Sequence, residues 1–116
     1  MITLTLPWPP SVNHYYRRVG NVTLISKEGR RFRKRVAGEV LLAGSPRVEG
    51  RLAVWIVASP PDLRRRDLDN VQKALLDALQ HAGVYGDDSQ IDRITVERGL
   101  QTSGGMVLVQ VEAVTP

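Results

Sequence analysis

The 116-residue sequence contains no cysteine and only two histidines, His14 and His81. Disulfide bonds and thiolate metal sites are therefore excluded, and two histidines are too few for a histidine-based metal cage. No apolar run approaches the roughly 20 residues that cross a bilayer, and the N-terminus lacks the charged head and long apolar stretch of a secretion signal. We therefore expect a cytoplasmic protein with no membrane partner, folded as a single domain over residues 1–116.

Charge is unevenly distributed along the chain, whose formal net charge is +4. Segment 17–35 holds eight Lys and Arg residues against Glu28 alone, whereas segment 67–97 holds seven Asp and Glu residues against Lys73 and Arg93. A basic segment is typical of nucleic-acid binding, although a solvated helix face gives the same pattern. Because carboxylates repel phosphate, the adjacent acidic segment favours a metal-dependent nuclease over a simple DNA-binding protein.

Hydrophobic periodicity predicts an α+β fold with the order β-α-β-α-β-β. Residues 2–6 alternate between apolar and polar side chains, which predicts a short strand. Residues 11–25 are expected to form an ordered loop. The nearly continuous apolar run 52–58 predicts a strand covered on both faces. Residues 91–98 and 106–114 predict two further strands, joined as a hairpin around Gly104 and Gly105.

Two helices are predicted between these strands. Ser26 is a candidate N-cap for the first, and residues 44–46, Gly-Ser-Pro, end it. The apolar stripe of this helix is Phe32, Val36, Val40 and Ala43, and its opposite face carries Arg30, Arg31, Lys34 and Arg35. The second helix spans about residues 68–82 and stops at Gly83. A mixed sheet of about four strands with the two helices packed on it is the simplest arrangement.

The start of the second helix carries the first candidate site residues. Asp67 and Asp69 flank the helix start, where either carboxylate could serve only as an N-cap. Lys73 lies one turn after Asp69, so the two side chains either form an ordinary ion pair or face a ligand together. The preceding cations, Arg64, Arg65 and Arg66, either hold backbone phosphates or form a solubilising loop.

A second acidic pair, Asp87 and Asp88, follows the predicted end of this helix. A Gly-Asp-Asp turn is the ordinary interpretation of this pair. A helix of about 15 residues spans roughly 22 Å, so the pair reaches Asp67 only if the chain runs back along the helix or a neighbouring subunit's helix supplies the partner.

The carboxylates fit Mg²⁺, which takes oxygen ligands, and Mn²⁺ would fit the same ligands. Such an ion would orient hydroxide for in-line attack on phosphorus and offset charge on the leaving oxygen. Lys73 would then neutralise charge that develops on the phosphate.

Four ordered blocks of the chain resemble the RusA family of Holliday junction resolvases, and the likeness runs over essentially the whole length. They are residues 6–13 (Leu-Pro-Trp-Pro-Pro-Ser-Val-Asn) with 15–17 (Tyr-Tyr-Arg), residues 26–29 (Ser-Lys-Glu-Gly), residues 61–73 (Pro-Asp-Leu-Arg-Arg-Arg-Asp-Leu-Asp-Asn-Val-Gln-Lys) and residues 83–91, which contain Asp-Asp-Ser-Gln-Ile.

The resemblance implies a small homodimeric, magnesium-dependent endonuclease that resolves four-way DNA junctions by paired symmetrical nicks, in recombination, repair or phage DNA processing. Carried over by position, the family's catalytic and metal-binding carboxylates fall on Asp67, Asp69 and Asp88, and its catalytic lysine on Lys73. The resemblance also implies that dimerisation helps to assemble the acids. The expected DNA-contacting residues are Asn13, Arg17, Arg30, Arg31, Lys34, Arg64, Arg65 and Arg66. Asn13 and Tyr15 could either border the DNA surface or fix the loop around them.

Two interpretations from other classes remain open. The chain could be a non-catalytic basic DNA-binding module whose acids only cap helices. It could also be a cation-binding or protein-interaction domain whose basic surface is incidental.

Overall fold

A mixed four-stranded sheet forms one layer of the molecule, and the computed structural model describes residues 1–115. Its strands are β1 (Ile2–Pro7), β4 (Leu52–Ser59), β5 (Ile91–Arg98) and β6 (Met106–Ala113), in the spatial order β1-β6-β4-β5. β4 pairs parallel with β5 and antiparallel with β6, which also pairs antiparallel with β1. The predicted α+β class and the mixed sheet of four strands are confirmed.

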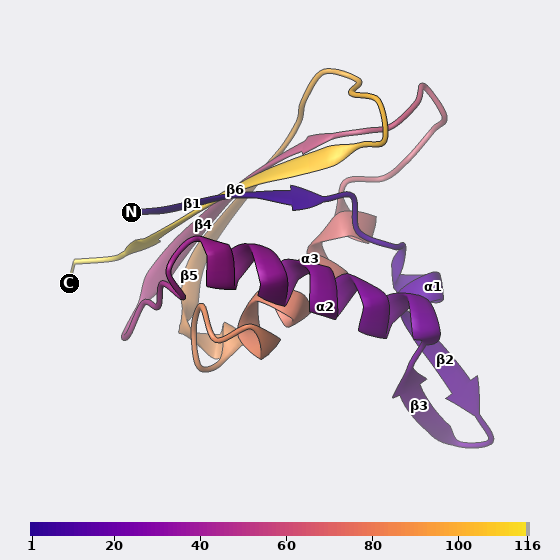
Figure 1. The fold of residues 1–116 in the computed structure, drawn as a ribbon, viewed down its shortest axis with the longest axis horizontal. Helices are drawn as coiled ribbons and strands as arrows, with labels where there is room; N and C mark the ends of the chain where they lie inside the picture. Colours follow the sequence, from indigo (N-terminus) through magenta and orange to yellow (C-terminus); the bar gives the residue numbers. More distant parts are fainter. Residues whose placement is uncertain (116) are drawn as a thin grey trace.

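Two long helices, α2 (Lys27–Leu42) and α3 (Asp69–His81), cover one face of this sheet (Figure 1). The predicted N-cap of α2 is confirmed, since the Ser26 hydroxyl accepts a hydrogen bond from the Gly29 N–H at 2.9 Å. The predicted stripe is buried except for Ala43, which follows the helix end and is exposed. None of the helices in residues 1–115 is long and apolar enough to cross a membrane.

β4 has one buried face and one open face, so the prediction that both faces are covered is wrong. Leu52, Val54 and Ile56 point toward the helices and are fully buried, whereas Trp55 on the other face is 46% exposed. The apolar run misled the prediction because α2 and α3 pack on the same side of the sheet. The indole N–H of Trp55 instead donates to Glu97 on β5 at 3.0 Å.

β5 and β6 do not form the predicted hairpin, because β4 lies between them. The chain β4-α3-β5 makes a parallel crossover, and residues 99–105 then pass across the end of β4 to reach the β6 position. Two backbone hydrogen bonds hold this passage: the Gly99 N–H donates to Ala58 O at 2.8 Å and the Thr102 N–H to Pro60 O at 2.9 Å. Gly104 and Gly105 have positive φ, which suits a long turn as well as a hairpin.

Residues 11–25 contain three elements in place of the predicted loop, which raises the predicted two helices to three. They are α1 (Val12–Tyr15), β2 (Tyr16–Val19) and β3 (Val22–Ile25), and the two strands form a separate antiparallel hairpin that projects from the body (Figure 1). The hairpin signal was a Gly20-Asn21 turn between two short runs, with Gly20 at φ 60°.

Tyr15 ties α1 to both long helices. Its side chain is fully buried, and its hydroxyl donates to the carboxylate of Asp77 on α3. Arg33 on α2 donates to the same carboxylate at 2.6 Å and to the Tyr15 hydroxyl oxygen at 2.9 Å. Burial, together with the Asp77 hydrogen bond, raises the pKa of Tyr15 well above its usual value. We call Tyr15, Arg33 and Asp77 the helix-junction network.

The close approach of α2 to α1 generates a first prediction. A methyl group on Gly29 would clash with the backbone oxygen of Tyr15 and lie 3.0 Å from Ile25, whereas one on Gly38 of the same helix would meet nothing within 4 Å. We expect Gly29→Ala to lower the free energy of unfolding by about 1–3 kcal/mol. Gly38→Ala, the matched control, should raise it by about 0.5–1 kcal/mol. Urea unfolding followed by circular dichroism measures both, and equal effects would contradict the packing described.

The helix-junction network generates a second prediction. Arg33→Met keeps the aliphatic length of the side chain but leaves the partly buried Asp77 with one fewer cationic partner. The free energy of unfolding should fall by about 1–3 kcal/mol. Arg35→Met, at an exposed position of the same helix, should change it by no more than about 0.5 kcal/mol. Chemical denaturation of the two variants side by side checks the difference, and matching values would show that the network adds no stability.

Candidate functional site

One face of α3 lines a hollow of about 420 Å³. Asp69, Lys73 and Asp77 succeed one another at intervals of four residues and therefore lie on one helical face. Tyr16, Gln72, Leu76 and Asp88 complete the lining. We call this cavity the α3 hollow, and it places two of the predicted carboxylates beside the predicted lysine.

Asp88 reaches the α3 hollow because the chain turns back along the helix. Gly83, at φ 86°, ends the helix, and the next two residues, Val84 and Tyr85, are fully buried. The Tyr85 hydroxyl donates to Leu76 O at 2.6 Å, and the Asp88 N–H donates to the side-chain oxygen of Gln80 at 3.0 Å. The sequence left two ways for the second acidic pair to approach the helix start. The chain runs back along its own helix, which is the first of them.

The two members of that pair differ in surroundings. The Asp87 carboxylate accepts a hydrogen bond from the Ser89 N–H at 2.8 Å and caps the 3₁₀ turn η1 (Asp88–Gln90). Gln90 completes the cap by accepting from the Asp87 N–H at 3.0 Å. The Ser89 hydrogen bonds lower the pKa of Asp87. The turn interpretation therefore describes Asp87, whereas Asp88 lines the α3 hollow.

Lys73 is held by an aromatic ring. Within residues 1–115 it forms no ion pair with Asp69 or another carboxylate, so the ordinary ion-pair interpretation is wrong. Its Nζ instead lies 5.8 Å from the centroid of the Tyr16 ring, within the range of a cation–π interaction. The Tyr16 ring stands edge-to-face against Tyr15 with centroids 4.8 Å apart. The helix-junction network thus supports the ring that faces Lys73.

Asp67 lies outside the α3 hollow. It lines a neighbouring groove of about 680 Å³, between the segment Trp8–His14 and the arginine-rich loop before α3. The N-cap residue of α3 is Leu68, and no side chain caps the helix there. The interpretation of Asp67 or Asp69 as a helix cap is therefore wrong. Helix capping does not account for two carboxylates at this position.

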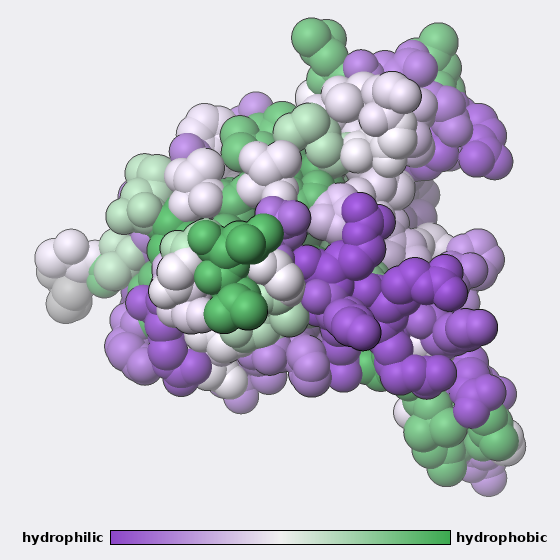
Figure 2. Space-filling model, viewed as in Figure 1, coloured by the Kyte–Doolittle hydropathy of each residue, from purple (hydrophilic) through white to green (hydrophobic). Residues whose placement is uncertain are grey.

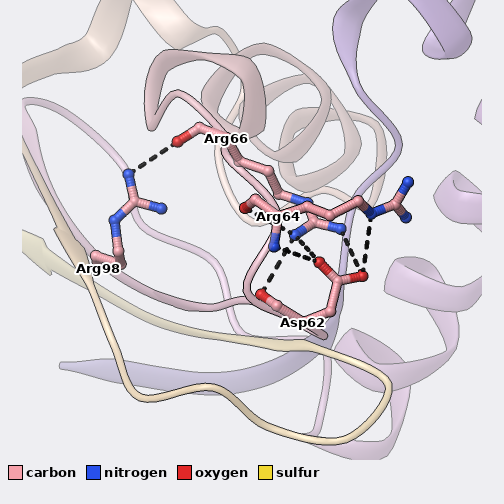
Figure 3. A network of polar contacts seen from close by, with 4 residues as sticks. All are labelled: Asp62, Arg64, Arg66 and Arg98. Carbon is pink, nitrogen blue, oxygen red and sulfur yellow. Dashed lines mark hydrogen bonds and ion pairs between the residues drawn. The ribbon is translucent and has the colours of Figure 1, made fainter.

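The arginines of that loop differ in their partners (Figure 3). Asp62 accepts from Arg66 at 2.6 Å and from Arg64 at 3.3 Å, and the Arg66 hydrogen bond is the main cause of its lowered pKa. The guanidinium carbon of Arg66 also lies 5.8 Å from the centroid of the Trp8 ring. The guanidinium of Arg98 donates to the backbone oxygen of Arg66 at 2.8 Å. Arg65 is exposed and has no hydrogen bond or ion pair within the described chain.

The remaining predicted DNA-contacting residues are exposed on α1, β2 and α2. They are Asn13, Arg17, Arg30, Arg31 and Lys34. Figure 2 shows a strongly hydrophilic surface over the half of α2 that adjoins the β2–β3 hairpin. Arg30 also donates to Ile25 O at 3.0 Å, so it helps to fix the end of β3.

The three predicted metal ligands do not meet within one chain. Among residues 1–115, no group of three or more histidine, aspartate or glutamate side chains is close enough to hold a metal ion. Asp69 and Asp88 share the α3 hollow, and Asp67 lines the adjacent groove. Their donors are all carboxylate oxygens, which suit Mg²⁺ or Mn²⁺.

Sequence reasoning missed Asp62, Tyr16 and the helix-junction network. Asp62 was visible as an acid just before the arginine run, and Asp77 as a carboxylate eight residues after Asp69 on the same helical face. The contribution of Tyr15 and Arg33 depends on contacts between elements far apart in the sequence, so no local pattern could reveal it.

Comparison with known proteins places these features in a family. The family model described as Endodeoxyribonuclease RusA matches residues 7–112. The crossover junction endodeoxyribonuclease rusA of Enterobacteria phage HK97 is 44% identical over 107 residues, which cover 91% of this chain and 89% of the relative. The protein of the same name from Enterobacteria phage 82 is 45% identical, with 88% and 86% covered. The corresponding Escherichia coli K12 protein is 43% identical, with 89% and 87% covered. The chain belongs to the RusA family of endodeoxyribonucleases.

Proposed function

We propose that this chain is a metal-dependent endonuclease that resolves four-way DNA junctions by paired symmetrical nicks. The observation that carries the proposal is the α3 hollow, which gathers Asp69, Lys73 and Asp88 on the surface. The phage and bacterial relatives are named for action on crossover junctions, which supports the choice of branched DNA as substrate. The whole of residues 1–116 would act as one nuclease domain.

In this proposal the acidic side chains bind the metal ion and the basic side chains bind DNA phosphates. Asp67, Asp69 and Asp88 would hold Mg²⁺, or Mn²⁺ in its place, through carboxylate oxygens once a second copy completes the set. When bound, such an ion supplies Lewis-acid activation of the attacking water. Lys73, which has no competing ion pair within residues 1–115, neutralises charge that develops on the scissile phosphate. Arg65 binds the adjacent backbone phosphate, and Arg64 and Arg66 give the groove a positive wall that Asp62 keeps in place.

We infer that the active form is a homodimer. Asp67 lies outside the hollow that holds Asp69 and Asp88, so a single chain presents an incomplete set of ligands. A second copy that packs near the α3 start would complete the set, and paired nicks require two sites. The competing idea of a non-catalytic DNA-binding module fits less well, because neither Asp67 nor Asp69 caps α3.

The proposed metal-ligand role is tested on a synthetic four-way junction with magnesium, manganese or a chelator, mapping both cut strands. Wild-type protein should make paired nicks only with metal. Asp69→Asn should slow cutting by roughly 100-fold or more, with junction affinity kept or increased because a negative charge beside phosphate is removed.

Asp87→Asn is the matched control for this test. Asparagine caps a helix about as well as aspartate does, so this variant should cut at nearly the wild-type rate. Loss of binding together with cutting in Asp69→Asn, or equal losses in both variants, would remove the proposed ligand role of Asp69.

The proposed phosphate contact of Arg65 predicts a change in salt dependence. Arg65→Ala should weaken binding to all branched DNA and reduce the slope of log affinity against log salt by about 0.9. Arg51→Ala is the control, because Arg51 precedes β4 at the end away from the groove and pairs with Asp92. Affinities measured in chelator from low to high salt give both slopes. An unchanged slope for Arg65→Ala would show that its guanidinium does not contact phosphate.

A further inference from the structure

The β2–β3 hairpin is anchored at its base and free at its tip. Tyr16 and Ile25, which face each other at the base, pack against the hydrophobic core. The Ser26 hydroxyl donates to Tyr15 O at 2.9 Å, and Arg30 donates to Ile25 O at 3.0 Å. Beyond this base the hairpin stands clear of the body, as Figure 1 shows. Its direction is therefore fixed by the same contacts that set α1 and α2.

One face of the hairpin is apolar and exposed. The register places Val19 opposite Val22 at the tip and Arg17 opposite Leu24 two pairs below, so these four side chains share one face. Val19, Val22 and Leu24 are 52%, 57% and 40% exposed. Figure 2 shows the hairpin as a green projection beside the hydrophilic half of α2. A cluster of apolar side chains at the end of a projection contributes nothing to the core and is typical of a binding surface.

The position and charge of the hairpin indicate which partner covers this face. Its first residue, Tyr16, lines the α3 hollow, so the hairpin leaves the body directly from the proposed cutting site. Cations lie close to the apolar side chains. Arg17 shares their face, Arg18 lies on the other face of β2, and Arg30 and Arg31 lie at the start of α2. A second copy of this basic surface would be repelled, whereas DNA would be attracted.

We propose that the hairpin is a branch-point contact, in which Val19 and Val22 cover bases that lose a stacking partner where the strands of a junction exchange. Apolar side chains are known to insert between base steps and to open them. Arg17 and Arg18 hold the phosphates on either side of this opening. The contact gives the protein a means of distinguishing a branched substrate from a continuous duplex. This inference rests on the proposed junction-cutting function and adds the element that recognises the branch.

The test compares Val19→Ser/Val22→Ser with wild type on two DNAs of the same sequence, a four-way junction and a linear duplex. In the variant, the ratio of junction to duplex affinity, measured in chelator, should fall about tenfold, as expected when two valines lose their apolar contact. The fluorescence increase of 2-aminopurine placed at the branch point, which reports unstacking, should also be lost. Leu41→Ser/Leu42→Ser is the matched control, because these leucines are 70% and 84% exposed at the other end of α2.

The outcomes separate this inference from the proposed function. If wild type cuts junctions and the folded hairpin variant keeps both the affinity ratio and the fluorescence increase, the branch-point contact is wrong and the nuclease assignment stands. If the variant loses subunit association in sedimentation while its affinity ratio is unchanged, the apolar face binds a second copy and the proposal is overturned. If wild type neither prefers nor cuts junctions, the proposed function itself fails. Circular dichroism confirms that the variant is folded.

Discussion

The structure depends most on the contact between Tyr15, Arg33 and Asp77, which joins α1, α2 and α3. Asp77 lies one turn after Lys73, close enough in sequence for an ordinary i,i+4 ion pair. Such a pair contributes only a few tenths of a kcal/mol, whereas hydrogen bonds to a partly buried charged group contribute about 1.5–3 kcal/mol. Arg33 and Tyr15 therefore hold Asp77, which leaves Lys73 facing the Tyr16 ring in the α3 hollow. One contact thus packs the helices and keeps the proposed catalytic lysine available.

The reversal after α3 is the second constraint on the site. A 13-residue helix spans roughly 20 Å, so an acid beyond its C-terminus could have ended far from its N-terminal half. Tyr85 prevents this, because its buried ring and its hydrogen bond to Leu76 O draw the chain back along the helix. Asp88 is consequently placed by a buried side chain three residues before it, while Asp87 caps the 3₁₀ turn that begins at Asp88. The adjacent aspartates Asp87 and Asp88 thus have different environments, and this difference could not be predicted from the sequence alone.

Local patterns predicted the parts of the fold that local forces determine. Ser26 as an N-cap, the apolar spacing of α2 and the stop of α3 at Gly83 follow from interactions within a few residues, and they are confirmed except at Ala43, which lies beyond the helix end. The pairing of β5 with β6 was predicted wrongly because strand order depends on the α3 crossover and on how residues 99–105 cross the end of β4. The β2–β3 hairpin was missed because its exposed valines and arginines lack the buried alternation by which strands are usually recognised. Likewise, the four-residue spacing of Asp69 and Lys73 predicted that they share one helical face. Tyr16 lines the same hollow through tertiary contacts, which the spacing could not predict.

The separation of Asp67 from Asp69 and Asp88 has a consequence for how such an enzyme would be controlled. An endonuclease whose isolated subunit carried a complete ion site could nick any duplex that its arginines attract, since phosphate attraction carries no sequence information. If assembly of two subunits completes the ligand set, cutting is confined to the dimer, which presents two sites at once. Recognition of the branch by the hairpin would then act before chemistry, because Tyr16 connects the base of the hairpin to the hollow that holds Lys73. In such an enzyme, the division of the acids between two cavities would restrict cutting to the assembled dimer.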